Sequence, residues 1–322
     1  MNILPATLLL IWQSWHIPAV QTCTVTFAGD MMQHKAQIES AFRDSVSFNY
    51  SECFSAIRPV VSRATLAVCN FETPLGGAPY SGYPAFSAPD EFADAVADAG
   101  FDIFLTANNH CLDKGKKGLL RTLDKLDSLK IAHIGTYRNQ EERDSLHPLL
   151  VDAEGIRIAF LNYTYGTNGI DVPPPCIVNI IDTVQMEADL DKARMMNPDC
   201  VMVCVHWGDE YRQAPNTYQQ RLAGWLIRHG ADHVIGSHPH VVQPTVLYTD
   251  EAADSKGHVV AYSLGNFISN MSSAGTDIGK LLEIKIKRFI SATWLDSYTE
   301  QSVRTLRPAA GTRPYFKVIP AE

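Results

Sequence analysis

From residue 24 onward, short apolar runs alternate with longer amphipathic segments, and this rhythm constrains the fold more than any other feature of the chain. The short runs are rich in β-branched residues and have the length of ordinary strands. Strands that alternate with helical segments are typical of a layered α/β domain. We therefore predict an α/β fold with strands at residues 24–29, 65–70, 101–106, 156–163, 200–207, 232–237, 259–267 and 281–287.

Amphipathic segments with helix signals lie between these strands. The segment 90–100 begins with acidic residues and ends at Gly100, and the segment 217–230 ends at Gly230. In the segment 116–130, leucines recur at helical spacing and form one apolar stripe. Stripes of this kind are typical of helices that pack one face against a sheet, so we assign all three segments to helices.

The composition excludes some classes of protein. With 46% hydrophobic and 19% charged residues, the 322-residue chain can bury one large core or two modest ones, and it does not resemble a disordered protein. Its net charge of −8 and pI of about 5.8 leave no lysine or arginine stripe that could displace counterions from phosphates. We therefore expect no nucleic-acid partner.

The two ends of the chain lack the strand–helix rhythm. The apolar run within residues 1–22 is shorter than the ~20 residues that span a bilayer, but it has the length of a signal-peptide core. We expect export to the periplasm or cell envelope. Because no basic residues precede the run, a mis-assigned start or a peripheral amphipathic tail remains the alternative. Lipid anchoring at Cys23 is disfavoured because Thr22 precedes it and a strand follows at once.

We assign residues 24–288 to one domain and residues 289–322 to a tail that covers the surface or is mobile.

Metal-ligand residue types follow the predicted strands at the points where these strands end. In open α/β sheets the carboxyl ends of the strands meet at one edge, so we expect these side chains to lie close together. A single Asp, His or Asn-Asn pair at a strand end is usually turn or boundary chemistry. Turn or boundary chemistry does not explain, however, why metal-ligand residue types recur at the ends of successive strands. Carboxylate, amide and imidazole donors suit Mn²⁺, Fe or Zn²⁺, and here they occur at Asp30, Glu72, Asn108, Asn109, His110, His206, His238, His240 and Asn266.

The motifs at these strand ends resemble those of a known family. They are Gly29-Asp30, "NFETPL" (70–75), "TANNHCLDKG" (106–115), "HWGDEY" (206–211), "GSHPHVVQP" (236–244) and "YSLGNF" (262–267). In this order they are similar to the motifs of CapA-type capsule (poly-γ-glutamate) biosynthesis proteins, a family related to the calcineurin-like metallophosphoesterases. The resemblance covers nearly all of residues 24–288. It implies a four-layer α/β/β/α sandwich, which the strand–helix rhythm alone does not distinguish from a doubly wound sheet.

The resemblance also implies a ligand set. Asp30 matches the first aspartate of the metallophosphoesterases, and Glu72 stands where that superfamily has its bridging aspartate. Asn109 and His110 match its Asn-His pair, with Asn109 as a ligand and His110 as a non-ligand acid. The remaining ligands match the superfamily's isolated histidine and its closing histidine pair, at His206, His238 and His240.

One motif departs from the superfamily pattern. The first motif of the metallophosphoesterases is Asp-x-His, whereas this chain has Met32 two residues after Asp30. The thioether of Met32 is a poor ligand for a hard ion, so one metal position lacks a ligand unless His34 replaces it. The sequence therefore leaves open whether the site holds one ion or two.

A divalent ion would make hydrolysis the natural chemistry of such a site. A bound ion lowers the pKa of its water toward ~7 and so generates a hydroxide nucleophile. His110 could then protonate the leaving group as a general acid. Asp209 and Glu210 could orient water or recognise a cationic group, or they could be a solvated loop pair. Two loops rich in Gly, Pro, Tyr and Asn, 74–89 and 164–175, are long enough to be functional.

Two functions from different classes remain. The first is a metal-dependent hydrolase that acts on a phosphoester, or on an amide bond in an anionic polymer such as poly-γ-glutamate. The second is a non-catalytic envelope protein that assists polymer export or anchoring, keeps a remnant metal site and has membrane partners in capsule synthesis. Met32 favours the second function, and the retained His110 favours the first.

Overall fold

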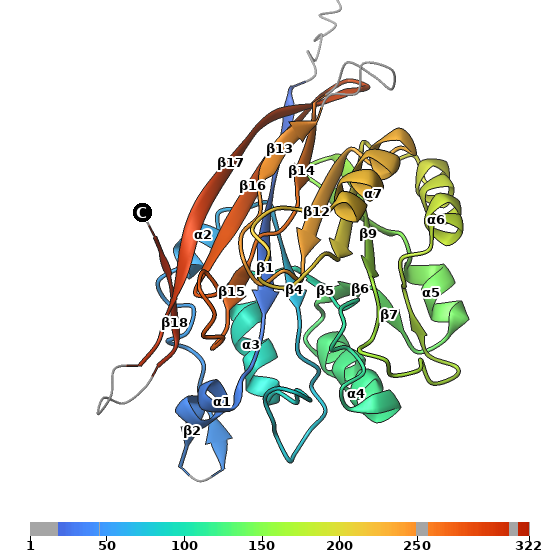
Figure 1. Cartoon of the computed structure of the whole chain (residues 1–322). Helices are drawn as coiled ribbons and strands as arrows, with labels where there is room; N and C mark the ends of the chain where they lie inside the picture. The colour runs from blue at the N-terminus through green and yellow to red at the C-terminus, as the bar shows by residue number, and fades with distance from the viewer. Residues whose placement is uncertain (1–18, 45, 249–256, 309–314, 322) are drawn as a thin grey trace, which may run out of the picture.

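The structure is a computed structural model that describes residues 19–44, 46–248, 257–308 and 315–321. Most of its strands belong to two large sheets that pack face to face (Figure 1). Among the described residues, no helix is both long and apolar enough to cross a bilayer. The predicted signal peptide at residues 1–22 lies outside the described part of the chain except for residues 19–22.

The first sheet has eight strands and contains the first strand of the chain near its centre. The order is β18-β17-β16-β1-β4-β5-β6, and β15 pairs with the end of β1. Strands β1, β4, β5 and β6 are parallel, so their carboxyl ends meet at one edge. The strands are β1 (Gln21–Met31), β4 (Leu66–Phe71), β5 (Ile103–Leu105), β6 (Ala132–Ile134), β15 (Asn266–Ile268), β16 (Ile278–Phe289), β17 (Ala292–Leu306) and β18 (Lys317–Pro320).

The second sheet has six strands in the order β13-β14-β12-β11-β9-β8. Its four inner strands, β9, β11, β12 and β14, are also parallel, so their carboxyl ends meet as well. The strands are β8 (Leu149–Ala153), β9 (Ile156–Thr164), β11 (Cys200–His206), β12 (His233–Ser237), β13 (Thr245–Tyr248) and β14 (His258–Ala261).

The apolar residues of each sheet alternate between two cores, as the two-residue repeat of a strand requires. In β11, Met202 and Cys204 face the core between the sheets, whereas Val203 and Val205 face the helices outside. The inner core is completed by residues such as Phe27 of β1. Because both faces of the central strands are covered, strands such as β11 read as nearly continuous apolar runs rather than alternating ones.

Helices cover the outer face of each sheet (Figure 1). Helices α2 (Arg58–Val61) and α3 (Asp90–Asp98) pack on the first sheet, and α6 (Thr183–Met195) and α7 (Thr217–Arg228) pack on the second. The resulting order of layers is α/β/β/α, and the predicted four-layer sandwich is confirmed. The smaller elements are α1 (Lys35–Ala41), α4 (Gly115–Ser128), α5 (Gln140–Leu146), β2 (Phe42–Arg43), β3 (Ser47–Phe48), β7 (Thr136–Tyr137) and β10 (Ile177–Val178).

The strand predicted at residues 259–267 is two strands in two different sheets. β14 pairs with β12 in the second sheet, and β15 pairs with β1 in the first. Between them the chain crosses from one sheet to the other, and Gly265 takes a positive φ of 67° there. Periodicity cannot reveal this crossing, because residues on both sides of it are buried and apolar.

The tail predicted at residues 289–322 is also different in the structure. Strand β17 pairs antiparallel with β16 along almost its whole length, and β18 pairs with β17, so this segment extends the first sheet. Most β17 side chains are exposed or only partly buried. A strand held mainly by backbone hydrogen bonds leaves little hydrophobic pattern in the sequence, which is why the periodicity does not predict the tail as part of the sheet.

Candidate metal centre

The first sheet brings two carboxylates to the edge where its parallel strands end. Asp30 lies near the end of β1, and Glu72 follows β4. A Cβ atom on Gly29 would lie 1.9 Å from the carbonyl oxygen of Gly265, so only glycine allows the backbone approach that precedes Asp30. The side chains of Asp30 and Glu72 are fully buried.

The second sheet brings three imidazoles to the same place. His206 is the last residue of β11, and His238 and His240 follow β12 on either side of Pro239. Both His238 and His240 have positive φ angles, 99° and 59°, which cost about 1–3 kcal/mol each in a residue other than glycine. Strain of this kind persists only where neighbouring contacts hold it, and it is typical of functional loops.

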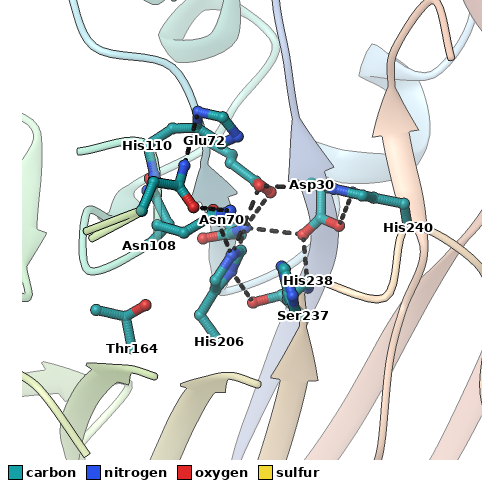
Figure 2. Close-up of polar contacts among 12 residues, drawn as sticks. Asp30, Asn70, Glu72, Asn108, His110, Thr164, His206, Ser237, His238 and His240 are labelled. Atoms are coloured by element: carbon teal, nitrogen blue, oxygen red, sulfur yellow. Dashed lines mark hydrogen bonds and ion pairs between the residues drawn. The ribbon is translucent and has the colours of Figure 1, made fainter. Parts of the chain in front are cut away.

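The carboxylates and imidazoles meet across the junction between the sheets (Figure 2). His240 Nδ1 lies 3.0 Å from Asp30 Oδ2, and His206 Nε2 lies 3.5 Å from Glu72 Oε1. His240 Nε2 lies 3.8 Å from the same oxygen of Glu72. The backbone amide of His238 donates to Asp30 Oδ1 at 3.4 Å. The structure thus brings together residues from four strand ends that are far apart in the sequence.

These side chains form two groups that share one residue. One group is Glu72, His238 and His240, and the other is Asp30, Glu72 and His206. Within each group, one possible ligand atom per residue lies within 4.8 Å of the others. Glu72 is therefore the residue on which both candidate groups depend.

Asn109 extends this set on the side of His206. Its Oδ1 lies 3.0 Å from His206 Nε2, the ring nitrogen that also faces Glu72. Its Nδ2 donates to Asn168 Oδ1 at 3.2 Å, which fixes the orientation of the amide. The Oδ1 atom is thus directed at the same point as the imidazole and the carboxylate.

Electrostatics also favours a cation at this point. Burial, together with the neighbouring Asp30, raises the pKa of Glu72 well above its ordinary value. Burial and the neighbouring imidazoles hold the pKa of His206 well below its ordinary value, and burial lowers the pKa of His238 to about 3. His206 and His238 are therefore neutral, which is the form that binds metal ions. A cation would compensate for the buried carboxylates.

Three buried polar atoms at the site have no hydrogen-bond partner among the described residues. They are Glu72 Oε1, His238 Nδ1 and Asn70 Oδ1. Buried polar atoms are almost always satisfied, and an unsatisfied one calls for an explanation such as a bound ion or water. Two of the three belong to residues of the two ligand groups, so the donor set fits a divalent ion.

Two amides support the ligands, a role that the sequence motifs do not predict. Asn70 Nδ2 lies 2.8 Å from Asp30 Oδ1 and 3.1 Å from Glu72 Oε2, and it therefore orients both carboxylates. Asn266 Oδ1 lies 3.1 Å from His240 Nδ1. Both residues are strand-end amides in the motifs. Their supporting role depends on strand register, since Asp30 is paired with Asn70 on one side and with Asn266 on the other.

His110 lies beside the cluster and is oriented by an acid. Its Nδ1 lies 2.8 Å from Asp113 Oδ2, and both side chains are buried. The ring also packs edge-on against Phe86, with ring centroids 4.6 Å apart. Asp113 Oδ2 in addition accepts a hydrogen bond from the Phe86 amide at 2.7 Å. One carboxylate therefore holds both the His110 ring and the loop that contains Phe86.

The two residues near the incomplete first motif do not restore it. Met32 is buried and lines a cavity next to His240. His34 Nδ1 lies 3.1 Å from Gln37 Oε1 and accepts from the Asn270 amide at 3.3 Å. His34 lines the same cavity but is in neither of the two ligand groups.

The structure separates the two acids that follow His206. Asp209 is exposed, and its Oδ2 accepts from Asn216, the N-cap residue of α7, at 2.8 Å. This contact stabilises the segment that leads into α7. Glu210 lines the cavity that His110 and His240 also line. Of this pair, Glu210 is the one placed to meet a substrate.

Both predicted functional loops flank the cluster. In the loop that follows β9, the ring of Tyr165 stacks on His206 with an angle of 8° between the planes, and it also contacts His238. Two other aromatic residues that flank this region are structural: Trp207 is buried in the outer core and donates to the Tyr262 carbonyl at 3.0 Å, and Tyr163 donates to Asp189 at 2.8 Å.

A family model described as bacterial capsule synthesis protein PGA_cap matches residues 24–271. This range contains every strand end that contributes to the cluster. The chain belongs to this family. The family assignment agrees with the resemblance seen in the sequence motifs.

Curated relatives give the same family. The chain is 27% identical over 277 residues to the capsule biosynthesis protein CapA of Bacillus anthracis, and the match covers 82% of this chain and 64% of the relative. It is 26% identical over 286 residues to the PGA biosynthesis protein CapA of Bacillus subtilis strain 168, with 82% and 68% covered. The match thus spans about two thirds of the length of each relative.

Solved structures show a distant likeness. The calcineurin-like phosphoesterase YfkN from Bacillus subtilis has a TM-score of 0.48 and 13% identity, with 88% of this chain and 91% of that chain covered. The 5′-nucleotidase from Candida albicans has a TM-score of 0.47 and 10% identity, with 87% and 52% covered. The α/β/β/α layer order follows from the strand pairings and cores of this chain itself.

Proposed function

We propose that this PGA_cap family protein is an exported, metal-dependent hydrolase that acts on capsule or other cell-envelope material. The observation that carries the proposal is the position of Glu72, which is fully buried and shared by the two ligand groups. Its Oε1 has no hydrogen-bond partner among the described residues. The ions that suit its mixed oxygen and nitrogen donors are Mn²⁺, Fe and Zn²⁺.

Different residues at the cluster have different roles in the proposed hydrolysis. A divalent ion held by the cluster would lower the pKa of a bound water toward ~7. Asn70 holds the two carboxylates in place, and Asn109 is directed at the same point from the side of His206. Tyr165 covers His206 and His238, so it limits the access of bulk water from that side.

His110 supplies the proton for the leaving group in this proposal. Asp113 Oδ2 accepts a hydrogen bond from His110 Nδ1, which leaves Nε2 as the nitrogen for proton transfer. His110 also lines the cavity beside the cluster, so it can reach a bound substrate. General acid catalysis of this kind contributes typically ~10²–10⁴-fold to the rate.

Met32 supports a second candidate function. The thioether stands where the related metallophosphoesterases have a histidine, and His34 is held by other partners. A site weakened in this way suits a non-catalytic accessory protein for polymer export or anchoring, with membrane proteins of capsule synthesis as its partners. Activity measurements distinguish this function from hydrolysis.

The test begins with metal content and substrate screening. The purified protein is analysed for bound metal and then assayed with Mn²⁺ on phosphodiester and γ-glutamyl substrates. We expect hydrolysis that falls at least ~10²-fold in His110→Ala, the general acid variant, and further in His206→Ala, the ligand variant. Because His229 lies at the end of α7 and stacks on Trp225, His229→Ala serves as the matched control and should keep wild-type activity.

Two results would contradict the proposal. Hydrolysis that survives both His110→Ala and His206→Ala does not come from this site. Bound metal without hydrolysis of either substrate class would favour the accessory function instead.

Export is tested separately. The mature N-terminus is sequenced from envelope and secreted fractions. We expect a processed chain in those fractions, and an intact Met1 in the cytoplasm would contradict this part of the proposal.

A further inference from the structure

A cavity of about 270 Å³ opens beside the metal cluster. Two residues of the site, His110 and His240, form part of its wall, so a substrate whose reacting bond lies at the cluster would extend into it. Ligand sites in proteins usually measure ~300–1,000 Å³, so this cavity suits one small group rather than a length of polymer. Its other lining residues are Met32, His34, Tyr83, Glu210, Tyr211, Asn270, Met271, Ser272 and Ser273.

The charge of the lining is unusual for a site next to phosphoester chemistry. Glu210 is the only acidic side chain in the lining, and no lysine or arginine lines this cavity in the described part of the chain. His34 does not add a positive charge, because burial lowers its pKa to about 4. The cavity wall therefore contains one acidic side chain and no lysine or arginine, together with the imidazoles of His34, His110 and His240.

The remaining wall is aromatic and apolar. Tyr83 and Tyr211 contribute rings, and both are well exposed, at 72% and 44%. Met32 and Met271 contribute thioethers. Aromatic faces next to a carboxylate attract ammonium and quaternary ammonium groups, because the ring quadrupole and the negative charge act together.

Arg307 is a cation that contacts one residue of this wall. Its Nη2 donates to the Met271 carbonyl, and the residue is exposed. It is not part of the cavity lining. Arg307 therefore contributes no side chain to the cavity wall, whereas Glu210 does.

We propose that this cavity binds a positively charged group of the substrate, an ammonium or trimethylammonium, with Glu210 as its charge partner and Tyr83 and Tyr211 as its aromatic walls. The inference rests on the proposed hydrolysis at the adjacent cluster and names the substrate class: an ester or amide that carries an amine close to the bond that is cleaved. A second phosphate or carboxylate in this position would meet Glu210 as a like charge.

Matched substrates test the proposal with the metal-loaded protein. p-Nitrophenyl phosphorylcholine is compared with methyl p-nitrophenyl phosphate, which lacks the cation. γ-Glutamyl-p-nitroanilide is compared with its N-acetyl derivative in the same way. The first pair represents lipid-type head groups and the second represents free amino groups of a peptide or polymer. We expect a lower KM for the charged member of whichever pair is cleaved.

Glu210→Gln should remove this preference. We expect the KM ratio between the neutral and the charged substrate to fall up to about fivefold, which corresponds to losing one favourable charge contact at an exposed site. Tyr83→Leu should reduce the ratio about threefold. Asp209→Asn is the matched control, because it removes the neighbouring charge without altering the cavity wall, and the ratio should change less than twofold.

A direct binding experiment separates this proposal from the proposed function. Binding of tetramethylammonium to the metal-loaded protein is followed by NMR line broadening in the wild type and in Glu210→Gln. Binding that is lost in Glu210→Gln supports the cavity proposal even if no substrate is hydrolysed. A KM ratio unchanged in Glu210→Gln, or equal tetramethylammonium binding in both proteins, would overturn it.

Discussion

The two sheets contribute different chemistry to one cluster. The first sheet supplies oxygen donors, Asp30 and Glu72 from its strand ends and Asn109 from the loop that follows β5. The second sheet supplies nitrogen donors, the imidazoles of His206, His238 and His240. Each candidate group combines residues from both sheets.

This division shows that the site depends on how the sheets pack. The inner core between the sheets fixes their relative position, and the ligand atoms then lie within bonding reach of a shared ion. Within the described part of the chain, neither sheet alone supplies both the carboxylates and the imidazoles of a candidate group. A change that shifts one sheet against the other should therefore reduce metal binding even when every ligand is still present.

Glu72 should show the largest effect, because both groups depend on it. Glu72→Gln should lose its bound metal and reduce hydrolysis by ~10³-fold or more, since metal-based stabilisation contributes several kcal/mol. His238→Ala, which removes a donor from one group only, should lose less metal than Glu72→Gln. Metal analysis of the purified variants provides the measurement.

The folded state provides the control for Glu72. Its raised pKa means that the buried carboxyl favours the neutral form without metal, so Gln is a close replacement in shape and charge. The metal-free variant should melt within a few degrees of the metal-free wild type. A Glu72→Gln protein that binds wild-type amounts of metal would refute the dependence of both groups on Glu72.

Away from the cluster, His233 of the second sheet should make folding sensitive to acid. Its Nδ1 accepts from the Val259 amide at 3.0 Å, and burial lowers its pKa to about 3. The unfolded chain, with a histidine pKa of about 6.5, binds the proton more strongly. The contribution of the neutral His233 side chain to the free energy of unfolding is therefore complete above pH 6.5. It is lost as the pH falls toward 3, and the loss amounts to ~3 kcal/mol at pH 4.

Urea unfolding at several pH values measures this loss. His233→Asn should show a smaller decrease in the free energy of unfolding between pH 7 and pH 4 than the wild type. Equal decreases in the two proteins would mean that His233 does not bind a proton differently in the two states.

Asn70 should have an intermediate effect, as a support rather than a ligand. Asn70→Ala removes the hydrogen bonds that orient Asp30 and Glu72, and such losses typically cost ~10–100-fold in metal affinity. Ser237 offers the counterpart in the second sheet, since its Oγ lies 3.0 Å from His206 Nδ1. Ser237→Ala should cost less, because it affects one ligand. Competition with a chromophoric chelator measures both affinities.

Gly265 should show the smallest effect of the four. Its φ of +67° is a left-handed conformation, and a Cβ atom would lie 2.9 Å from the Ile278 carbonyl oxygen. Gly265→Ala should destabilise the fold by about 1–2 kcal/mol. Gly166 is a suitable control, because nothing lies within 4 Å of an added Cβ there. A melting temperature that changes equally in both variants would contradict this strain argument.

Much of the fold could be predicted from the sequence, because both faces of most strands are buried. Strands such as β9 and β11 are continuous apolar runs, and their predicted ranges agree closely with the structure. The crossing between β14 and β15 could not be predicted, since buried apolar residues lie on both sides of it. Strand β17 could not be predicted either, because its pairing with β16 leaves its side chains exposed.

For the site, residue types could be predicted but partners could not. The sequence identified Asp30, Glu72 and the histidines by their recurrence at strand ends. It treated Asp209 and Glu210 alike, whereas the structure places Glu210 on the cavity and Asp209 at the start of α7. The roles of Asn70 and Asn266 depend on strand register, which a single sequence does not specify.

The place of β1 in the first sheet has a consequence for the order of events during synthesis. β1 leaves the ribosome first among the described strands, yet two of its neighbours, β15 and β16, are made much later in translation. Gln21, for example, is paired with Arg288. The strands that surround Asp30 are therefore not all present until most of the polypeptide has been made. In the proposed function, a metal ion would therefore bind only after most of the chain has been made, and products truncated before β15 should be purified without metal.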